Sequence, residues 1–142
     1  MIGVVLDANV LAPGFLNRGS ASGEFINLWQ REVYELVVSE HLLAELTRTY
    51  TDPYFQRRIE SGEVALITHL LRRRATLTDL TVSVTGAATQ PKDDLVLSTA
   101  LSGKASLLGT RDRQLLKLGA FREVRIASPS QLLEELWRRS DL

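Results

Sequence analysis

The chain has 142 residues, and its 17 Lys and Arg residues are balanced by 17 Asp and Glu residues. A chain of this length is expected to form a single domain over residues 1–142, removing roughly two-thirds of its unfolded surface from water. The hydrophobic fraction of 44% and the charged fraction of 24% exclude a disordered or fibrous chain. Because the formal net charge is zero, there is no global basic field to drive nonspecific nucleic-acid binding, so any such binding must be local.

The absence of cysteine excludes disulfides, thiolate metal sites and cysteine nucleophiles, and it fits a reducing compartment. Residues 1–6 contain no basic region followed by a long apolar segment and a cleavage site, so we expect no export signal. No apolar stretch approaches the roughly 18 residues needed to span a bilayer. These features predict a cytoplasmic protein that does not associate with a membrane.

Short β-like runs alternate with helical stretches along the chain, which predicts an α/β domain with a parallel sheet. Residues 2–6 are a continuous apolar run, typical of a strand covered on both faces. Asp7 follows directly, and open α/β sheets bind ligands just outside the carboxyl ends of their strands. Small and polar residues at 17–23 predict a loop and a helix start, and the apolar spacing at 25–29 predicts the helix itself.

The second predicted strand covers residues 34–38. Ser39 is placed to cap the helix that follows, which carries Glu45 among its leucines. The Thr-Asp-Pro sequence at 51–53 ends that helix and restarts another. Residues 62–77 predict a further helix with an apolar stripe.

A third, short strand is predicted at 81–84 from its β-branched residues. A loop of small and polar residues then leads to a helix over 92–101. On that helix Asp93 shares a face with three apolar residues, Val96, Leu97 and Ala100. Asp94 would point inward instead if the helix began one residue later, but the apolar stripe favours Asp93.

The remaining elements are two strands and two helices. Residues 106–109 predict a fourth strand, and residues 112–118 predict a short helix that ends at Gly119. Residues 124–127 predict a fifth strand. The Ser-Pro-Ser-Gln sequence at 128–131 has proline and glutamine where a capped helix start favours them, so a last helix begins there.

Four acidic residues each lie beside an apolar run, which suggests one site built from distant pieces of the chain: Asp7, Glu45, Asp93 and Asp112. Burying four carboxylates together would raise their pKa values and cost several kcal/mol, because like charges in a low dielectric disfavour ionisation. A hard divalent cation removes that conflict. Ligation by carboxylate oxygens alone is typical of Mg²⁺ or Mn²⁺, whereas Zn²⁺ would require Cys or more His than this chain has.

Each of these residues also has a simpler interpretation when it is considered alone. Asp7 could form a turn at the end of its strand, and Asp112 could cap the helix that follows it. Glu45 could be a solvated helix residue paired with His41 one turn earlier. The occurrence of all four together favours the functional interpretation.

Four motifs carry a resemblance to a known family: Asp-Ala-Asn-Val at 7–10, Ser-x-x-Leu-Leu-x-Glu-Leu at 39–46, Pro-Lys-Asp-Asp-x-Val-Leu at 91–97 and Thr-x-Asp at 110–112. Each motif is weak alone, but their order and spacing together are fairly specific. The chain resembles the PIN domain over essentially its whole length, and in particular the VapC-like toxin components of bacterial toxin–antitoxin pairs.

The resemblance implies a three-layer α/β/α sandwich around a parallel sheet of four or five strands, and a Mg²⁺- or Mn²⁺-dependent endoribonuclease that cleaves single-stranded RNA. It implies that the catalytic, metal-binding residues are Asp7, Glu45, Asp93 and Asp112, with Asn9, Asp94 and Thr110 in support. A cognate antitoxin is the implied protein partner. The resemblance also implies a homodimer, for which the Leu- and Ile-rich segment 62–77 is the expected interface.

The chain departs from the family pattern near two of the acidic residues. Gln90 stands where these relatives commonly carry Asp, and Arg111 and Gln114 flank Asp112 where they commonly carry Gly and a further Asp. These departures keep open a catalytically impaired PIN-like module that binds an antitoxin or an RNA-processing partner. A phosphotransfer enzyme is a third reading, although the sequence at 7–9 is not followed by the Thr of the Asp-x-Asp-x-Thr phosphatase pattern.

Overall fold

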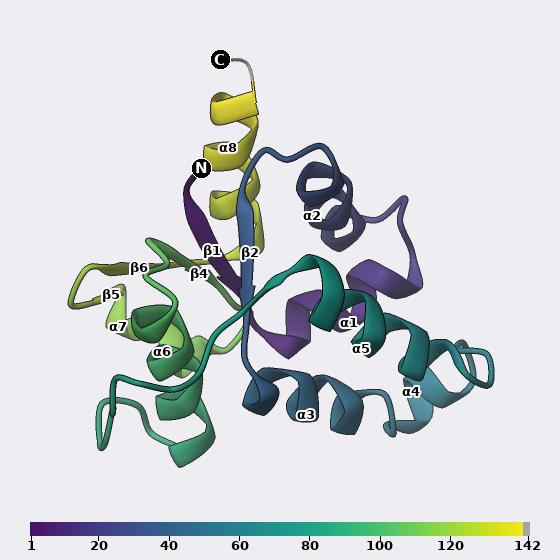
Figure 1. Cartoon of the computed structure of the whole chain (residues 1–142), viewed down its shortest axis with the longest axis horizontal. Helices are drawn as coiled ribbons and strands as arrows, with labels where there is room; N and C mark the ends of the chain where they lie inside the picture. The colour runs from purple at the N-terminus through teal and green to yellow at the C-terminus, as the bar shows by residue number, and fades with distance from the viewer. Residues whose placement is uncertain (141–142) are drawn as a thin grey trace.

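The computed structural model describes residues 1–140, and its centre is a twisted, mostly parallel sheet with helices on both sides (Figure 1). The strands are β1 (Gly3–Leu6), β2 (Glu35–Val38), β3 (Thr76–Leu77), β4 (Leu107–Gly109), β5 (Ala120–Phe121) and β6 (Val124–Ala127). Their order across the sheet is β3-β2-β1-β4-β6-β5, and only β5 runs antiparallel to its neighbour. The predicted α/β fold class is confirmed, with five parallel strands and one short antiparallel edge strand.

The helices are α1 (Ala8–Leu16), α2 (Ala21–Gln30), α3 (Glu40–Thr49), α4 (Pro53–Gln56), α5 (Glu63–Arg74), α6 (Pro91–Ser102), α7 (Arg113–Leu118) and α8 (Pro129–Ser140). Within residues 1–140, none of them has both the length and the apolar composition needed to cross a bilayer.

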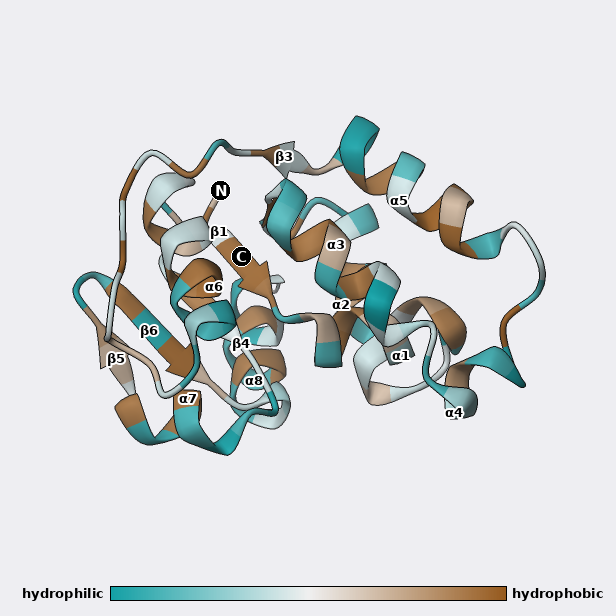
Figure 2. Cartoon of the chain, turned by 90° about the horizontal axis from the view of Figure 1, so that it is seen from below, coloured by the Kyte–Doolittle hydropathy of each residue, from teal (hydrophilic) through white to brown (hydrophobic). Residues whose placement is uncertain are grey.

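The central strand β1 is buried along its whole length and pairs with β2 on one side and with β4 on the other. In Figure 2 most of the strand is coloured hydrophobic. Leu6 pairs with Gly109, so Asp7 and Thr110 emerge at the same edge of the sheet. The backbone N–H of Asp7 donates to the Gly109 carbonyl at 2.9 Å, which fixes the chain at this edge.

Several local signals in the sequence match the observed element ends. Ser39 accepts a hydrogen bond from the Leu42 N–H and caps α3. Ser128 and Gln131 form the predicted reciprocal cap of α8, since the Ser128 N–H donates to Gln131 Oε1 at 3.0 Å. Gly119 follows α7 with a φ of 70°, which glycine adopts without strain. These ends depend on neighbouring residues only, so the sequence predicts them well.

The predicted strand at 81–84 is wrong. The third strand is β3, which pairs with the end of β2, and the preceding helix ends at Arg74 rather than at residue 77. The backbone of Val82 is instead satisfied by α6, because its N–H donates to Ser102 Oγ at 3.0 Å and its carbonyl accepts from Ser98 Oγ. The hydroxyl groups of these two serines thus take the place of the strand-to-strand backbone hydrogen bonds that β-branched residues favour.

The sequence did not predict α1, whose interior contains Pro13 and Gly14. Proline in a helix interior removes one backbone hydrogen bond, so a segment that contains proline does not have a typical helical sequence. The helix packs closely on α2, since a Cβ at Gly14 would lie 2.8 Å from the Ser22 carbonyl oxygen. A Cβ at Gly23 would lie 2.4 Å from the carbonyl oxygen of Asn17, the residue that follows α1. Helix α2 begins at Ala21, inside the predicted loop, where the Ser20 hydroxyl caps it by accepting from the Gly23 N–H at 3.0 Å.

Candidate active site

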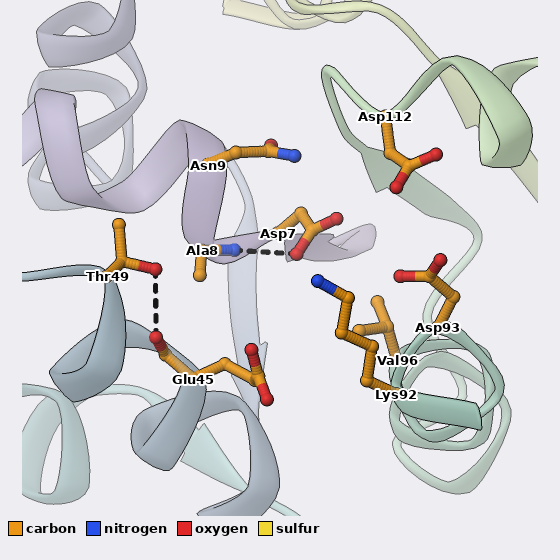
Figure 3. Close-up of a pocket in the computed structure, with 9 residues that line it drawn as sticks. All are labelled: Asp7, Ala8, Asn9, Glu45, Thr49, Lys92, Asp93, Val96 and Asp112. Atoms are coloured by element: carbon orange, nitrogen blue, oxygen red, sulfur yellow. Dashed lines mark hydrogen bonds between the residues drawn. The ribbon is translucent and has the colours of Figure 1, made fainter. Parts of the chain in front are cut away.

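The four predicted carboxylates line a single cavity at the carboxyl edge of the sheet (Figure 3). Asp7 follows β1, Glu45 lies on α3, Asp93 lies in the first turn of α6, and Asp112 precedes α7. The other residues that line the cavity are Ala8, Asn9, Thr49, Lys92 and Val96. Segments separated by up to about a hundred residues in the sequence therefore meet at one place.

Asp7 is nearly buried, with 9% of its surface exposed. Its Oδ1 accepts a hydrogen bond from the Ala8 N–H at 2.8 Å, and its Oδ2 accepts one from the Thr110 hydroxyl at 2.8 Å. Burial raises the pKa of Asp7, the two hydrogen bonds oppose that rise, and the charge of Asp112 adds to it. Asp7 is therefore both the cap of α1 and a wall of the cavity.

Thr110 links two of the acidic residues. Besides donating to Asp7, its hydroxyl accepts a hydrogen bond from the Asp112 N–H at 3.0 Å. The side chain of Asn9 accepts from the Arg111 N–H at 3.1 Å, so it holds the loop that carries Asp112. Thr110 thus positions the carboxylate of Asp7 and the backbone of Asp112, and Asn9 positions the adjoining backbone of Arg111.

Asp112 uses one carboxylate oxygen to cap α7. Its Oδ1 accepts from the N–H groups of Gln114 and Leu115 at 2.8 and 3.2 Å. Figure 3 shows the carboxylate directed toward Asp93 across the cavity. Like Asp7, Asp112 therefore both caps a helix and lines the cavity.

Asp93 and Asp94 are adjacent in sequence but lie in different environments. Asp93 lines the cavity, and burial together with the charges of Asp112 and Asp7 raises its pKa to about 6. Asp94 instead accepts hydrogen bonds from three loop amides, those of Gly86, Ala87 and Ala88, at 3.0, 3.1 and 2.7 Å. The helix phase inferred from the apolar stripe places Asp93 in the cavity, whereas Asp94 anchors the loop before α6.

Glu45 lies on the α3 side of the cavity, where its carboxylate forms an ion pair with Arg48. The pairing of Glu45 with His41, which belonged to the alternative interpretation of Glu45 as a solvated helix residue, is not found within residues 1–140. The ring Nε2 of His41 lies 3.2 Å from the backbone carbonyl of Lys92, so His41 joins α3 to the start of α6. This contact holds two walls of the cavity together.

Lys92 is a cavity residue to which the sequence assigned no role. It lies beside Asp93 at the start of α6, and Figure 3 shows its amino group pointing toward Asp7. Its charge lowers the pKa of both Asp7 and Asp93, against the larger effect of burial. The position of Lys92 within the third acidic motif was the available signal.

The donor chemistry of the cavity fits a hard divalent cation, because the candidate ligands are carboxylates and the pKa values of Asp7 and Asp93 are raised by burial and mutual repulsion. As the side chains lie in residues 1–140, no three acidic or imidazole groups converge on one point that could hold a metal ion. The carboxylate of Glu45 is in an ion pair with Arg48. A complete ligand set would therefore require side-chain movement.

A family model described as "PIN domain" matches residues 3–114, a range that includes all four cavity carboxylates. The chain belongs to the PIN domain family. PIN domains are generally nucleases, so the membership supports a hydrolase. The resemblance seen in the sequence motifs is thereby confirmed.

A solved structure also resembles this PIN domain in fold. It is the crystal structure of VapBC2 from Rickettsia felis bound to a DNA fragment from the promoter of that pair. The TM-score is 0.59 and the identity 16%, with 89% of this chain and 98% of that chain covered. A search of curated proteins found no match.

Proposed function

We propose that this PIN domain is an endoribonuclease that cleaves single-stranded RNA and depends on Mg²⁺ or Mn²⁺. The observation that carries the proposal is the meeting of Asp7, Glu45, Asp93 and Asp112 at one cavity of a PIN fold. Carboxylates alone would repel an RNA phosphate, so they require a cation to become useful for phosphodiester hydrolysis.

Asp7 and Asp93 are the residues we propose as direct metal ligands, because both are buried carboxylates with raised pKa values. Glu45 and Asp112 complete the ligand set or orient the attacking water. A bound divalent cation would lower the pKa of a bound water and neutralise charge that develops on the phosphoryl oxygens. A hard cation of this kind is also the group that favours ionised carboxylates at this site.

The chain's own residues contribute by positioning. Thr110 holds the carboxylate of Asp7 and the backbone of Asp112 at once, and Asn9 holds the adjoining loop. Asp94 keeps the loop before α6 folded, which fixes the place where Asp93 enters the cavity. Preorganised ligands of this kind save the reorganisation that a flexible site would need.

The biological setting we propose is the toxin of a toxin–antitoxin pair, with a cognate antitoxin as protein partner. The support is the motif pattern of the chain and its fold likeness to the VapBC2 structure. We also propose a homodimer through segment 62–77, where Leu66 is 68% exposed and Leu77 is 45% exposed. A mass in solution that stays monomeric at all concentrations would contradict the dimer.

A PIN-like binding module is the second candidate, and one observation favours it. The acidic groups do not converge as they lie, and Gln90 and Gln114 stand where further acid would strengthen the site. In that case the cavity would have no catalytic activity, and the function would lie in the surface that binds the partner.

The test is cleavage of a labelled single-stranded RNA with Mn²⁺, with Mg²⁺ and with excess chelator. The nuclease proposal expects cleavage only with the cations, and its loss in Asp7→Asn and in Asp93→Asn. Asp79→Asn is the matched control, since Asp79 is exposed and lies outside the cavity. Cleavage by both cavity variants at the wild-type rate would overturn the proposal.

A further inference from the structure

Lys92 lies at the rim of the acidic cavity, as the second residue of α6 and the neighbour of Asp93. Its side chain is exposed, and Figure 3 shows it extending from α6 with its amino group toward Asp7. Across residues 1–140 it is the one basic side chain that lines this cavity. Four carboxylates thus share their rim with a single protein cation.

Two other cations near this edge already have partners. Arg48 pairs with Glu45, and Arg111 donates to the Ser22 hydroxyl at 2.6 Å. Within the described part of the chain, the Lys92 ammonium has no hydrogen bond and no ion pair within 4.0 Å, although carboxylates surround it. Its three donors therefore remain available to a ligand.

The backbone beneath Lys92 is fixed, in contrast to its side chain. The Lys92 carbonyl contacts the His41 ring at 3.2 Å, Pro91 occupies the first position of the helix, and Asp94 binds three amides of the preceding loop. A four-carbon stem on such a base can swing its charge over the cavity mouth without disturbing the fold.

We propose that Lys92 is a substrate-binding residue whose ammonium donates to a nonbridging phosphate oxygen of single-stranded RNA at the cavity mouth. The inference rests on the proposed function, since RNA is the substrate proposed there. Lysine binds phosphate as a point charge, and here it offsets the repulsion between a phosphate and the carboxylate rim. With Lys92, the cavity mouth can bind an anionic chain such as RNA. With the carboxylates alone, it would repel one.

The test measures the binding of a short, fluorescein-labelled single-stranded RNA of mixed sequence by fluorescence anisotropy. The titrations contain Ca²⁺ and are repeated over a range of salt concentrations. Lys92→Gln removes the charge, and Lys92→Arg retains it. Lys104→Gln is the matched control, because Lys104 is exposed beyond the far end of α6 and the change in net charge is the same. A gel at the end of each titration verifies that the RNA is intact.

We expect Lys92→Gln to weaken binding about tenfold and to reduce the slope of log affinity against log salt by about 0.7, as the loss of one phosphate contact on a single strand predicts. Lys92→Arg should retain most of the affinity, and Lys104→Gln should leave the slope unchanged. The proposal is overturned if Lys92→Gln and Lys104→Gln bind alike, or if the wild-type chain does not bind RNA at low salt.

Cleavage in Mn²⁺ is scored separately on the same proteins. A wild-type chain that binds RNA through Lys92 but does not cleave it would support the Lys92 contact and contradict the nuclease. A chain that cleaves with unchanged binding in Lys92→Gln would do the reverse. If Lys92 only neutralised the carboxylates, its removal would strengthen Mn²⁺ binding and leave RNA binding unchanged, which also counts against the proposal.

Discussion

At the third acidic motif, two adjacent aspartates have separate structural roles. Asp93 is 4% exposed and Asp94 is 7% exposed, yet one lies among like charges and the other among backbone donors. The first environment penalises the ionised form of Asp93, whereas the second gives the carboxylate of Asp94 three backbone hydrogen-bond donors. Substitutions at the two positions should therefore differ in stability and in activity.

Asp94→Ala should lower the free energy of unfolding by about 2 to 4 kcal/mol, because it leaves the amides of Gly86, Ala87 and Ala88 without their acceptor. Urea unfolding measures this loss, with Asp79→Ala as an exposed control. Below the unfolding transition, Asp93→Ala should impair cleavage more than Asp94→Ala. Equal unfolding midpoints for Asp94→Ala and the control would show that the loop does not depend on Asp94.

The pKa of Asp93, raised from 3.8 to about 6, predicts a pH-dependent stability of the metal-free protein. The folded chain binds this proton more tightly than the unfolded chain, so the contribution of Asp93 is most favourable below pH 3.8 and is lost as the pH rises through about 6. Asp93→Asn should stabilise the metal-free protein by about 1 kcal/mol at neutral pH, after allowance for solvent screening.

Unfolding of wild type and Asp93→Asn in chelator, measured between about pH 4 and pH 8, tests this linkage. The advantage of the variant should shrink as the pH falls toward the unfolded pKa. A constant difference at all pH values would mean that the charge of Asp93 is not the cause.

At the scale of elements, the sequence predicted what neighbouring residues determine. The cap at Ser39, the reciprocal cap at Ser128 and the stop at Gly119 match the structure, because each depends on bonds within one turn. The strand at 81–84 failed because Ser98 and Ser102, from a distant helix, satisfy that backbone. Contacts of that kind do not appear in local pattern or propensity.

The candidate site shows the same division. The apolar stripe of α6 located Asp93, since helix phase is a local property. The pairing of Glu45 with Arg48 and the reach of Lys92 toward Asp7 depend on rotamers and on the approach of other elements, so the sequence did not give them. The acidic character of the site could be predicted from residue type, whereas the contacts of the individual side chains could not.

The close approach of α2 to the connection that follows α1 leads to a further prediction. A Cβ at Gly23 would lie 2.4 Å from the Asn17 carbonyl oxygen and 2.5 Å from backbone atoms of Arg18, and backbone cannot move aside as a flexible side chain can. Gly23→Ala should therefore destabilise the protein by about 2 kcal/mol or more, as overpacking does. A Cβ at Gly19 meets no atom nearer than 3.5 Å, so Gly19→Ala is the control.

Chemical denaturation of the two glycine variants distinguishes them. The same loss of stability in both would show that the close approach of Gly23 to the backbone of residues 17–18 is not the cause, because reduced unfolded-state entropy alone would stabilise both variants.

At the scale of the whole molecule, parallel pairing of β1 with β4 brings Asp7 and the loop of Asp112 to one edge, and α3 and α6 add Glu45 and Asp93. The topology thus gathers like charges that destabilise one another in the absence of a cation. A ligand that binds only the folded state would offset this repulsion, adding about 2.7 kcal/mol at roughly a hundred times its Kd.

The central claim is that these carboxylates form a site for a divalent cation, and thermal unfolding of the metal-free protein during titration with Mn²⁺ tests it most directly. Because Gln90 and Gln114 reduce the acid near the cavity, we expect a single-site rise in unfolding temperature in the millimolar range, and no rise with K⁺ at matched ionic strength. Asp7→Asn should remove most of the rise, whereas Asp79→Asn should retain it. A melting temperature that does not respond to several millimolar Mn²⁺ or Mg²⁺, or an equal response in Asp7→Asn, would contradict the claim.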